Sequence, residues 1–181
     1  MASAIAEIGK SFDFEGFPIG AVVERDKKII GQSSNKLFSR NNPTSHAEYL
    51  AIDKAINSIK ENYPGEKYPD FFKDATLYTT LEPCPMCAGK TTMLRFKRIV
   101  ICDNDEEWGY FTKQKNMNNF PESPIVEYSN LNICKELRSQ TDWNINSLWH
   151  QGQGYAAATN QVPSKLDFLI RKIFYYFDRI L

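Results

Sequence analysis

Residues 75–87 read Ala-Thr-Leu-Tyr-Thr-Thr-Leu-Glu-Pro-Cys-Pro-Met-Cys. The first six residues, Ala75 to Thr80, are rich in β-branched and aromatic side chains, which predicts a strand. Pro85 suits the first turn of a helix, where its missing N–H is not needed, and we expect that helix to continue to about Leu94. Arg98 to Cys102 predicts a further strand. A strand, a helix and a second strand in succession indicate parallel pairing and an α/β fold.

The preceding half of the chain extends this α/β pattern. A short helix is expected from about Ala2 to Lys10, followed by two strands joined by a turn at residues 25–27. Apolar residues at helical spacing predict a helix that ends near Lys60, capped by Thr44 or Ser45 with Glu48 completing a capping box. The two strands joined by the turn span residues 19–24 and 28–32. After residue 103 the pattern is weaker, and it predicts a strand over 124–128 and helices over 130–138 and 164–181.

Four side chains in this framework carry a metal-site pattern. His46-Ala47-Glu48 is followed 35 residues later by Pro83-Cys84-Pro85-Met86-Cys87. Catalytic zinc is held by three protein ligands with a fourth position left for water, and His46, Cys84 and Cys87 supply that number. Glu48 is then a spare carboxylate beside the metal, placed to act as the base that activates the water. We expect the metal to lie where two helix N-termini meet, because only there can His46 and Glu48 converge.

These motifs resemble the cytidine deaminase-like superfamily, in particular its tRNA adenosine, guanine and fungal-type cytosine deaminases. The resemblance runs from about Pro18 to Asp103. It implies a three-layer α/β/α fold with a mixed five-stranded sheet, one zinc ion per chain and a homodimer built partly on the helix that starts at Pro83. We expect residues 1–181 to form one deaminase domain, with residues 104–181 as a C-terminal extension and residues 61–74 as a packed insertion.

The resemblance also implies a reaction and a substrate contact. The chain is expected to be a hydrolase of C–N bonds in cyclic amidines that releases ammonia, with Glu48 carrying protons between water, ring nitrogen and departing amine. Asn35 lies 11 residues before His46, where relatives place an asparagine on the substrate. A turn-forming role for Asn35 is the alternative. Trp108 follows a strand end and is a candidate for stacking on a heterocycle, with surface packing as the alternative. For Glu82 we expect a structural role.

A structural zinc site is the main alternative to a catalytic one. Cys102 or Cys134 could in principle supply a fourth ligand, although neither belongs to a Cys-x-x-Cys pair and a closed site has no use for Glu48. We expect Cys102 to be a small core residue, no disulfide framework, and a reducing, cytoplasmic compartment. The third class considered is an inactive binding protein that keeps zinc for stability, which the intact Glu48 argues against.

Composition bears on the substrate. Lysine plus arginine and aspartate plus glutamate each total 22, so the chain lacks the basic character of most nucleic-acid-binding proteins. We therefore expect a free nucleobase, nucleoside or related aminated heterocycle, and keep a tRNA wobble adenosine as the alternative. Membrane association is not expected, because no run of 18 apolar residues and no basic-then-apolar leader occurs. For the tRNA alternative, phosphate contacts would have to come from Arg95, Lys97, Arg98, Arg171, Lys172 and Arg179.

One departure from the family concerns the helix that follows the cysteines. Lys90, Thr91 and Thr92 stand where the resemblance leads us to expect apolar residues. The metal ligands are unaffected, but polar residues stand on the helix from which the expected dimer surface would be built.

Overall fold

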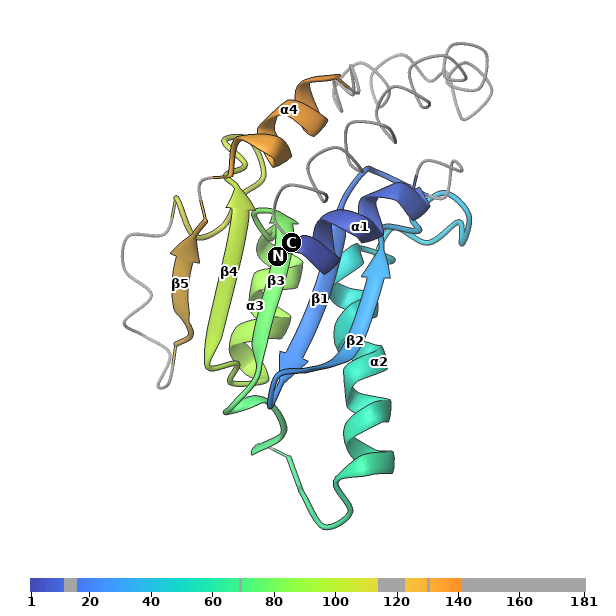
Figure 1. Cartoon of the computed structure of the whole chain (residues 1–181), viewed down its shortest axis with the longest axis vertical. Coiled ribbons are helices and arrows are strands. Elements are labelled where there is room, and N and C mark those ends of the chain that lie inside the picture. Colours follow the sequence, from blue (N-terminus) through green and yellow to red (C-terminus); the bar gives the residue numbers. More distant parts are fainter. Residues whose placement is uncertain (12–15, 69, 114–122, 130, 141–181) are drawn as a thin grey trace.

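The computed structural model describes residues 1–11, 16–68, 70–113, 123–129 and 131–140. Within them, a mixed five-stranded sheet has the order β2-β1-β3-β4-β5, with β1 antiparallel to both neighbours and β3, β4 and β5 parallel. The predicted α/β class and mixed sheet are confirmed (Figure 1). The elements are α1 (Ala2–Ser11), β1 (Gly20–Arg25), β2 (Lys28–Ser34), α2 (Ala47–Asn62), the 3-10 helix η1 (Asp70–Phe72), β3 (Thr76–Leu81), α3 (Pro85–Met93), β4 (Arg98–Asp103), β5 (Ile125–Tyr128) and α4 (Asn132–Gln140).

Two apolar clusters cover opposite faces of the sheet and make three layers. The larger one joins alternate residues of the strands, such as Val23 and Ile99, to Ala51 and Ile59 of α2. The smaller one joins Ile5 and Ile8 of α1 to Cys102 of β4 and Cys134 of α4. Because successive strand residues point to opposite faces, β4 contributes Ile99 and Ile101 to the larger cluster and Cys102 to the smaller one. The helices α2 and α3 therefore lie on one face, and α1 and α4 on the other (Figure 1).

Close backbone contact explains one glycine of β2. A Cβ added at Gly31 would lie 2.2 Å from the carbonyl oxygen of Ala51. Only glycine lets α2 pack this close to the strand, so Gly31 sets the distance between α2 and the sheet. The hairpin before it is the predicted turn, with Asp26 and Lys27 both in the left-handed region (φ 53° and 62°).

The N-terminus of α2 differs from the prediction. His46 is the N-cap residue and makes no side-chain cap, so the cap by Thr44 or Ser45 and the capping box of Glu48 are wrong. The reason is local: the N–H and hydroxyl of Thr44 both donate to Asn42 Oδ1 at 2.9 Å. Glu48 is thereby the second residue of α2, so it lies in the first turn as the metal-site pattern requires.

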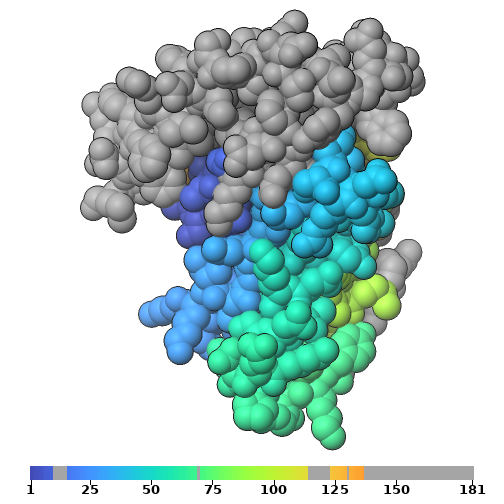
Figure 2. All heavy atoms as spheres, turned by 90° about the vertical axis from the view of Figure 1, so that its right-hand side faces the viewer, coloured from blue at the N-terminus to red at the C-terminus, as the bar shows by residue number. Residues whose placement is uncertain are grey.

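The segment after α2 packs against the lower end of the sheet. Phe72 is fully buried and stacks on Phe96, with ring centroids 4.4 Å apart. Arg25 donates to both carboxylate oxygens of Glu66 at 2.6 and 2.5 Å and lies over the ring of Tyr63. The expectation of a packed rather than loose segment is confirmed. In Figures 1 and 2 it forms the end of the molecule away from the start of α2.

The disulfide between Cys102 and Cys134 corrects the expectation that the chain has no disulfide. It links β4 to α4. The two cysteines are 32 residues apart in sequence, and the two elements are adjacent in the fold. The expected helix over residues 164–181 lies outside the described residues, as do Arg171, Lys172 and Arg179. No described helix has the length and apolar character that a membrane span needs.

Candidate active site

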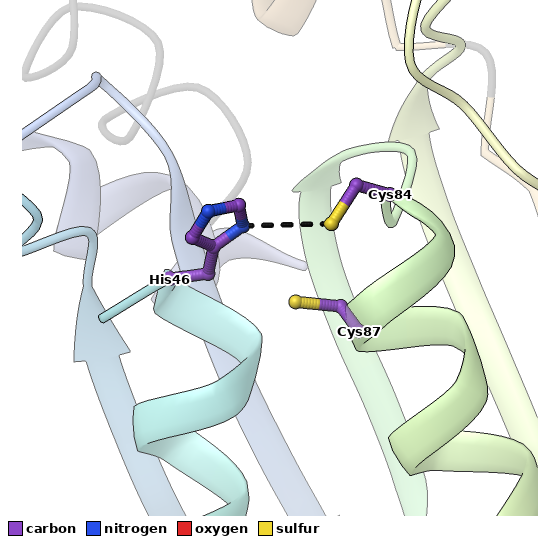
Figure 3. Close-up of side chains that lie close together, drawn as sticks. All are labelled: His46, Cys84 and Cys87. Carbon is purple, nitrogen blue, oxygen red and sulfur yellow. Dashed lines mark hydrogen bonds between the residues drawn. The ribbon is translucent and has the colours of Figure 1, made fainter. Parts of the chain in front are cut away.

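The candidate active site lies where the N-termini of α2 and α3 approach each other (Figure 3). His46 precedes the first residue of α2, and Cys84 holds the same N-cap position on α3. Cys87 follows one turn later, on the same face as Cys84. Both helices therefore direct their positive ends, which favour thiolates over thiols, toward this point.

The three side chains fit a zinc ion. The ligand atoms of His46, Cys84 and Cys87 all lie within 4.8 Å of one another, and His46 Nδ1 is 3.6 Å from Cys84 Sγ. Tetrahedral zinc with ordinary bond lengths places a nitrogen and a sulfur ligand about 3.5 Å apart. Among the described residues no other histidine, cysteine, aspartate or glutamate joins this group. The disulfide occupies Cys102 and Cys134, which removes both as candidates for a fourth ligand.

The pKa values of Cys84, Cys87 and His46 also indicate a site suited to a cation. A hydrogen bond from Cys87, together with His46, lowers the pKa of Cys84 to about 4. The same bond, with burial and the charge of Glu48, raises the pKa of Cys87 well above its usual value. Burial alone lowers the pKa of His46, but its contacts with Cys84 and Glu48 raise it overall. A divalent ion at this point would take the place of these shared protons, because zinc binds thiolates and neutral imidazole.

Glu48 is buried beside the metal ligands without being one of them. Its side chain interacts with Cys87, and burial is the main cause that raises its pKa to about 7. Its Oε2 atom is buried and has no hydrogen-bond partner. An unpaired carboxylate oxygen in such a place is costly unless a substrate or water group completes it. Glu48 is therefore suited to proton transfer rather than to packing.

Asn35 directly follows β2 and is completely buried. Its neighbour Lys36 donates its backbone N–H to Ser45, the residue before His46. The Asn35 Oδ1 atom accepts backbone N–H groups of Phe17 and Leu37, at 3.3 and 3.0 Å. Its Nδ2 is buried and unpaired. The turn-stabilising alternative thus describes the contacts of the oxygen, and the substrate contact of Asn35 stays a prediction.

Glu82 holds the loop that follows β4. Its carboxylate accepts the backbone N–H groups of Asp105 and Thr112, at 3.1 and 2.7 Å, and the Thr112 hydroxyl. Gly109 packs so closely that an added Cβ would lie 2.5 Å from the carboxyl carbon of Glu82. The expected structural role is therefore consistent with its contacts.

The side chain of Trp108, on that same loop, is 54% exposed. The loop runs beside the cysteine segment, since Tyr110 donates its N–H to the carbonyl of Pro83. No described contact joins the Trp108 ring to His46, Cys84 or Cys87, and its stacking role stays a prediction. Phe111, another aromatic residue after β4, packs against the larger apolar cluster.

Comparison with known proteins agrees with this geometry. The family of cytidine and deoxycytidylate deaminase zinc-binding regions matches residues 1–103, which include all four residues of the metal-site pattern. The chain therefore belongs to this family. Its match ends at Asp103, as the motif-based resemblance predicted, but begins before Pro18.

Individual relatives divide between two substrate classes. Over 92 residues the chain is 34% identical to tRNA-specific adenosine deaminase 2 of Xenopus tropicalis (51% of this chain, 53% of the relative). Over 102 residues it is 34% identical to cytosine deaminase of Candida albicans (56% and 62%). The chain thus spans roughly half to three-fifths of the length of these relatives. A solved structure from work on A-to-I editing by tRNA:A34 deaminases is 30% identical, with a TM-score of 0.57, covering 69% of this chain and 92% of that one.

Proposed function

We propose that the chain is a zinc-dependent hydrolytic deaminase that converts an amino group on a heterocycle to a carbonyl and releases ammonia. The observation that supports this most directly is the unpaired, buried Oε2 of Glu48 beside three ligands that fit zinc. A closed structural zinc site would not need a buried carboxylate beside its ligands. Zinc, when bound by His46, Cys84 and Cys87, would supply the Lewis acid that makes water nucleophilic near neutral pH.

In this proposal the chain's own residues move protons and hold the substrate. Glu48 takes a proton from the attacking water and delivers it to the ring nitrogen next to the reacting carbon. It then takes the second proton from the hydroxyl now bonded to that carbon and passes it to the departing amine, so that the carbonyl forms as ammonia leaves. One carboxylate suffices because these transfers occur in sequence. The Asn35 Nδ2 donor would bind a ring nitrogen or carbonyl oxygen of the substrate and so fix its orientation.

We further propose a free nucleobase, nucleoside or similar small heterocycle as the substrate. Among the basic residues considered for tRNA phosphates, Arg98 lies far from the metal ligands. It is the first residue of β4, and the last, Asp103, is at the metal end of the strand, where its carbonyl accepts the N–H of Glu82, two residues before Cys84. Six strand residues span about 17 Å. Arg98 is also engaged by Glu127 (3.7 Å) and the hydroxyl of Tyr78 (3.1 Å).

The loop at the metal end of β4 is acidic, which also favours a small-molecule substrate over tRNA. Glu106 and Glu107 are exposed on it. Carboxylates at this position would repel a phosphate backbone. A small neutral heterocycle carries no such penalty.

A tRNA adenosine is the second candidate, favoured by the tRNA-specific relatives. Lys36 and Arg40 also lie on the loop that leads to His46, where phosphates flanking an inserted nucleotide could reach them. Binding through such contacts would weaken steeply with salt.

An ammonia-release screen of the zinc-loaded protein separates these candidates. The substrates are cytosine, guanine, adenine, their nucleosides and an anticodon stem-loop, each tested at two salt concentrations. We expect release from at least one free base or nucleoside, with little dependence on salt. Activity on the stem-loop alone, falling steeply with salt, would replace the small-molecule substrate by tRNA. No release from any substrate by zinc-saturated protein would contradict the deaminase proposal and favour an inactive zinc-binding protein.

A further inference from the structure

Lys90 joins the two helices that carry the metal ligands. Its ammonium donates to the Asp53 carboxylate at 2.6 Å and to the Tyr49 carbonyl at 3.1 Å. The same ammonium lies 3.2 Å from the centroid of the Tyr49 ring. Lys90 belongs to α3, whereas Tyr49 and Asp53 belong to α2. A single cation therefore makes three contacts across the gap between the helices.

These contacts are close to the metal ligands on both sides. On α3, Lys90 is three residues after Cys87, so the two side chains share the face turned toward α2. On α2, Tyr49 is adjacent to Glu48, and its backbone N–H faces the Cys87 thiol. Residue 49 thus interacts with Cys87 through its N–H and with Lys90 through its carbonyl and ring.

Lys90 is also shielded more than an ordinary surface lysine. Its side chain is 15% exposed, compared with 51% for Asp53. Exposed ion pairs contribute little because water screens them, but a shielded ammonium with several partners is held in one position. The neighbouring Thr91 satisfies its hydroxyl within α3, donating to the Cys87 carbonyl at 2.6 Å. Lys90 and Thr91, two of the three polar residues that departed from the family expectation, thus find their partners inside this protomer, whereas the Thr92 hydroxyl is buried without a partner.

We propose that Lys90 is a positioning residue of the metal site, which sets the distance between the His46–Glu48 pair on α2 and the Cys84–Cys87 pair on α3. The inference rests on the proposed function, since it treats these residues as a metal site. Ligands on two separate helices, His46 on one and the two cysteines on the other, bind one ion tightly only when the helices keep a fixed separation. Groups that orient metal ligands without touching the metal typically change metal affinity by about 10–100-fold.

Cobalt binding tests the proposal without reference to activity, because Co²⁺ replaces zinc in tetrahedral sites and its absorption bands report ligand geometry. The variants are Lys90→Met, Asp53→Asn and their combination, with Lys90→Arg as the conservative change. Lys54→Met is the matched control: Lys54 also lies on α2 and donates to a carbonyl, that of Gln32 at 2.7 Å, but this hydrogen bond joins α2 to β2.

We expect Lys90→Met to weaken Co²⁺ binding about tenfold or more and to alter the absorption bands. Asp53→Asn should have a smaller effect that disappears in the Lys90→Met background, because both changes remove the same contact. Lys90→Arg should recover part of the affinity, and Lys54→Met should match the wild type. If Lys90→Met does not fold, Asp53→Asn carries the test, since the half-exposed Asp53 tolerates the change.

Two outcomes would overturn the inference, and they differ from failure of the proposed function. Lys90→Met with wild-type affinity and spectrum, or Lys54→Met as damaging as Lys90→Met, would show that Lys90 does not position the ligands. If the wild-type protein itself binds no Co²⁺ or Zn²⁺ in a thiolate site, the proposed function fails and the positioning role falls with it.

Discussion

At the scale of single residues, the chemistry proposed here depends on one carboxylate that is kept out of the metal's ligand set. Glu48 is close enough to interact with Cys87, yet the donor group within 4.8 Å comprises only His46, Cys84 and Cys87. The carboxylate remains available because His46 occupies the N-cap and Glu48 follows two residues later, inside the first turn. A carboxylate bound to the metal would have lost much of its basicity.

The first prediction is that Glu48→Gln abolishes deamination but preserves the metal site. Glutamine has the same shape but cannot accept and return a proton, so we expect turnover to fall by about 10²–10⁴-fold. Metal analysis should still give one zinc ion per chain. Glu107→Gln, an exposed carboxylate on the loop after β4, is the control and should remain active. Ammonia release at the wild-type rate by Glu48→Gln would show that another group transfers the protons.

At the scale of elements, the N-termini of α2 and α3 each bring a candidate metal ligand to the site from opposite sides. Each helix begins at a metal ligand, and neither N-cap side chain bonds its own helix. The N-terminal N–H groups that caps would otherwise satisfy are left to interact with the site. On the far face of the sheet, α4 is attached to β4 through Cys102 and Cys134.

The second prediction concerns this disulfide. A cross-link across 32 residues is expected to stabilise the fold by about 3–4 kcal/mol through the entropy of the unfolded chain. We expect Cys134→Ser to lose that amount in urea unfolding of the zinc-loaded protein. Wild-type protein in a non-chelating phosphine reductant should then unfold like the variant, and the variant should not respond to the reductant. A wild-type protein that the reductant leaves unchanged would contradict the cross-link.

The third prediction concerns the Arg25–Glu66 pair, which attaches the segment after α2 to β1. The hydrogen bond from Arg25 lowers the pKa of Glu66. A lowered carboxylate pKa gives stability that is present above the unfolded pKa, about 4.3, and lost as pH falls through the folded pKa. Glu66 is 30% exposed, so we expect Glu66→Gln to cost at most about 1 kcal/mol near pH 7.

The measurement is urea unfolding of Glu66→Gln and wild type between pH 7 and pH 3. The difference in free energy of unfolding should shrink as the pH falls below about 4, because wild-type Glu66 then becomes protonated. Glu61→Gln, an exposed carboxylate at the end of α2, is the control and should show no such trend. A pH-independent cost would mean that Glu66 acts through packing and not through its charge.

At the scale of the whole molecule, one face of α3 is exposed to solvent, with the Tyr68 hydroxyl, which donates to the Met93 carbonyl at 3.3 Å, at its far end. Pro85, Gly89 and Met93 recur every four residues and are all exposed, Met93 to 59%. An added Cβ at Gly89 would meet nothing within 4 Å. This stripe is the part of α3 on which the expected homodimer would have to form, since Cys87, Ala88, Thr91 and Thr92 are buried within the protomer.

The fourth prediction is therefore that Gly89→Glu separates a homodimer into folded monomers. The protomer has room for the side chain, and replacing glycine within a helix favours the helix, so folding should not suffer. A buried charge at the subunit contact would be unpaired on both sides. Light scattering at micromolar concentration should give a dimer for wild type and for the α2 control Asn57→Glu, and a monomer for Gly89→Glu. A monomeric wild type would remove the dimer altogether.

Several features of this protein follow from the sequence alone. The grouping of His46, Cys84 and Cys87, with Glu48 next to them, was predictable because metal chemistry demands particular atoms at short spacings near helix ends. The strands and helices were predictable to within a few residues because hydrophobic periodicity is a local property. The parallel pairing of β3 with β4 was predictable from the helix that connects them.

Other features depend on groups that meet only after folding. The disulfide partner of Cys102, the contact of Lys90 with Asp53 and the two hydrogen bonds that occupy Asn35 Oδ1 join residues with no spacing signature. The N-cap of α2 shows the same limit within one loop: Thr44 is a good cap by type, but its bonds to Asn42 leave His46 to begin the helix. Local propensity determines which residues can serve, whereas the tertiary structure decides which partners they find, because each polar group binds the partner that folding brings within about 3 Å.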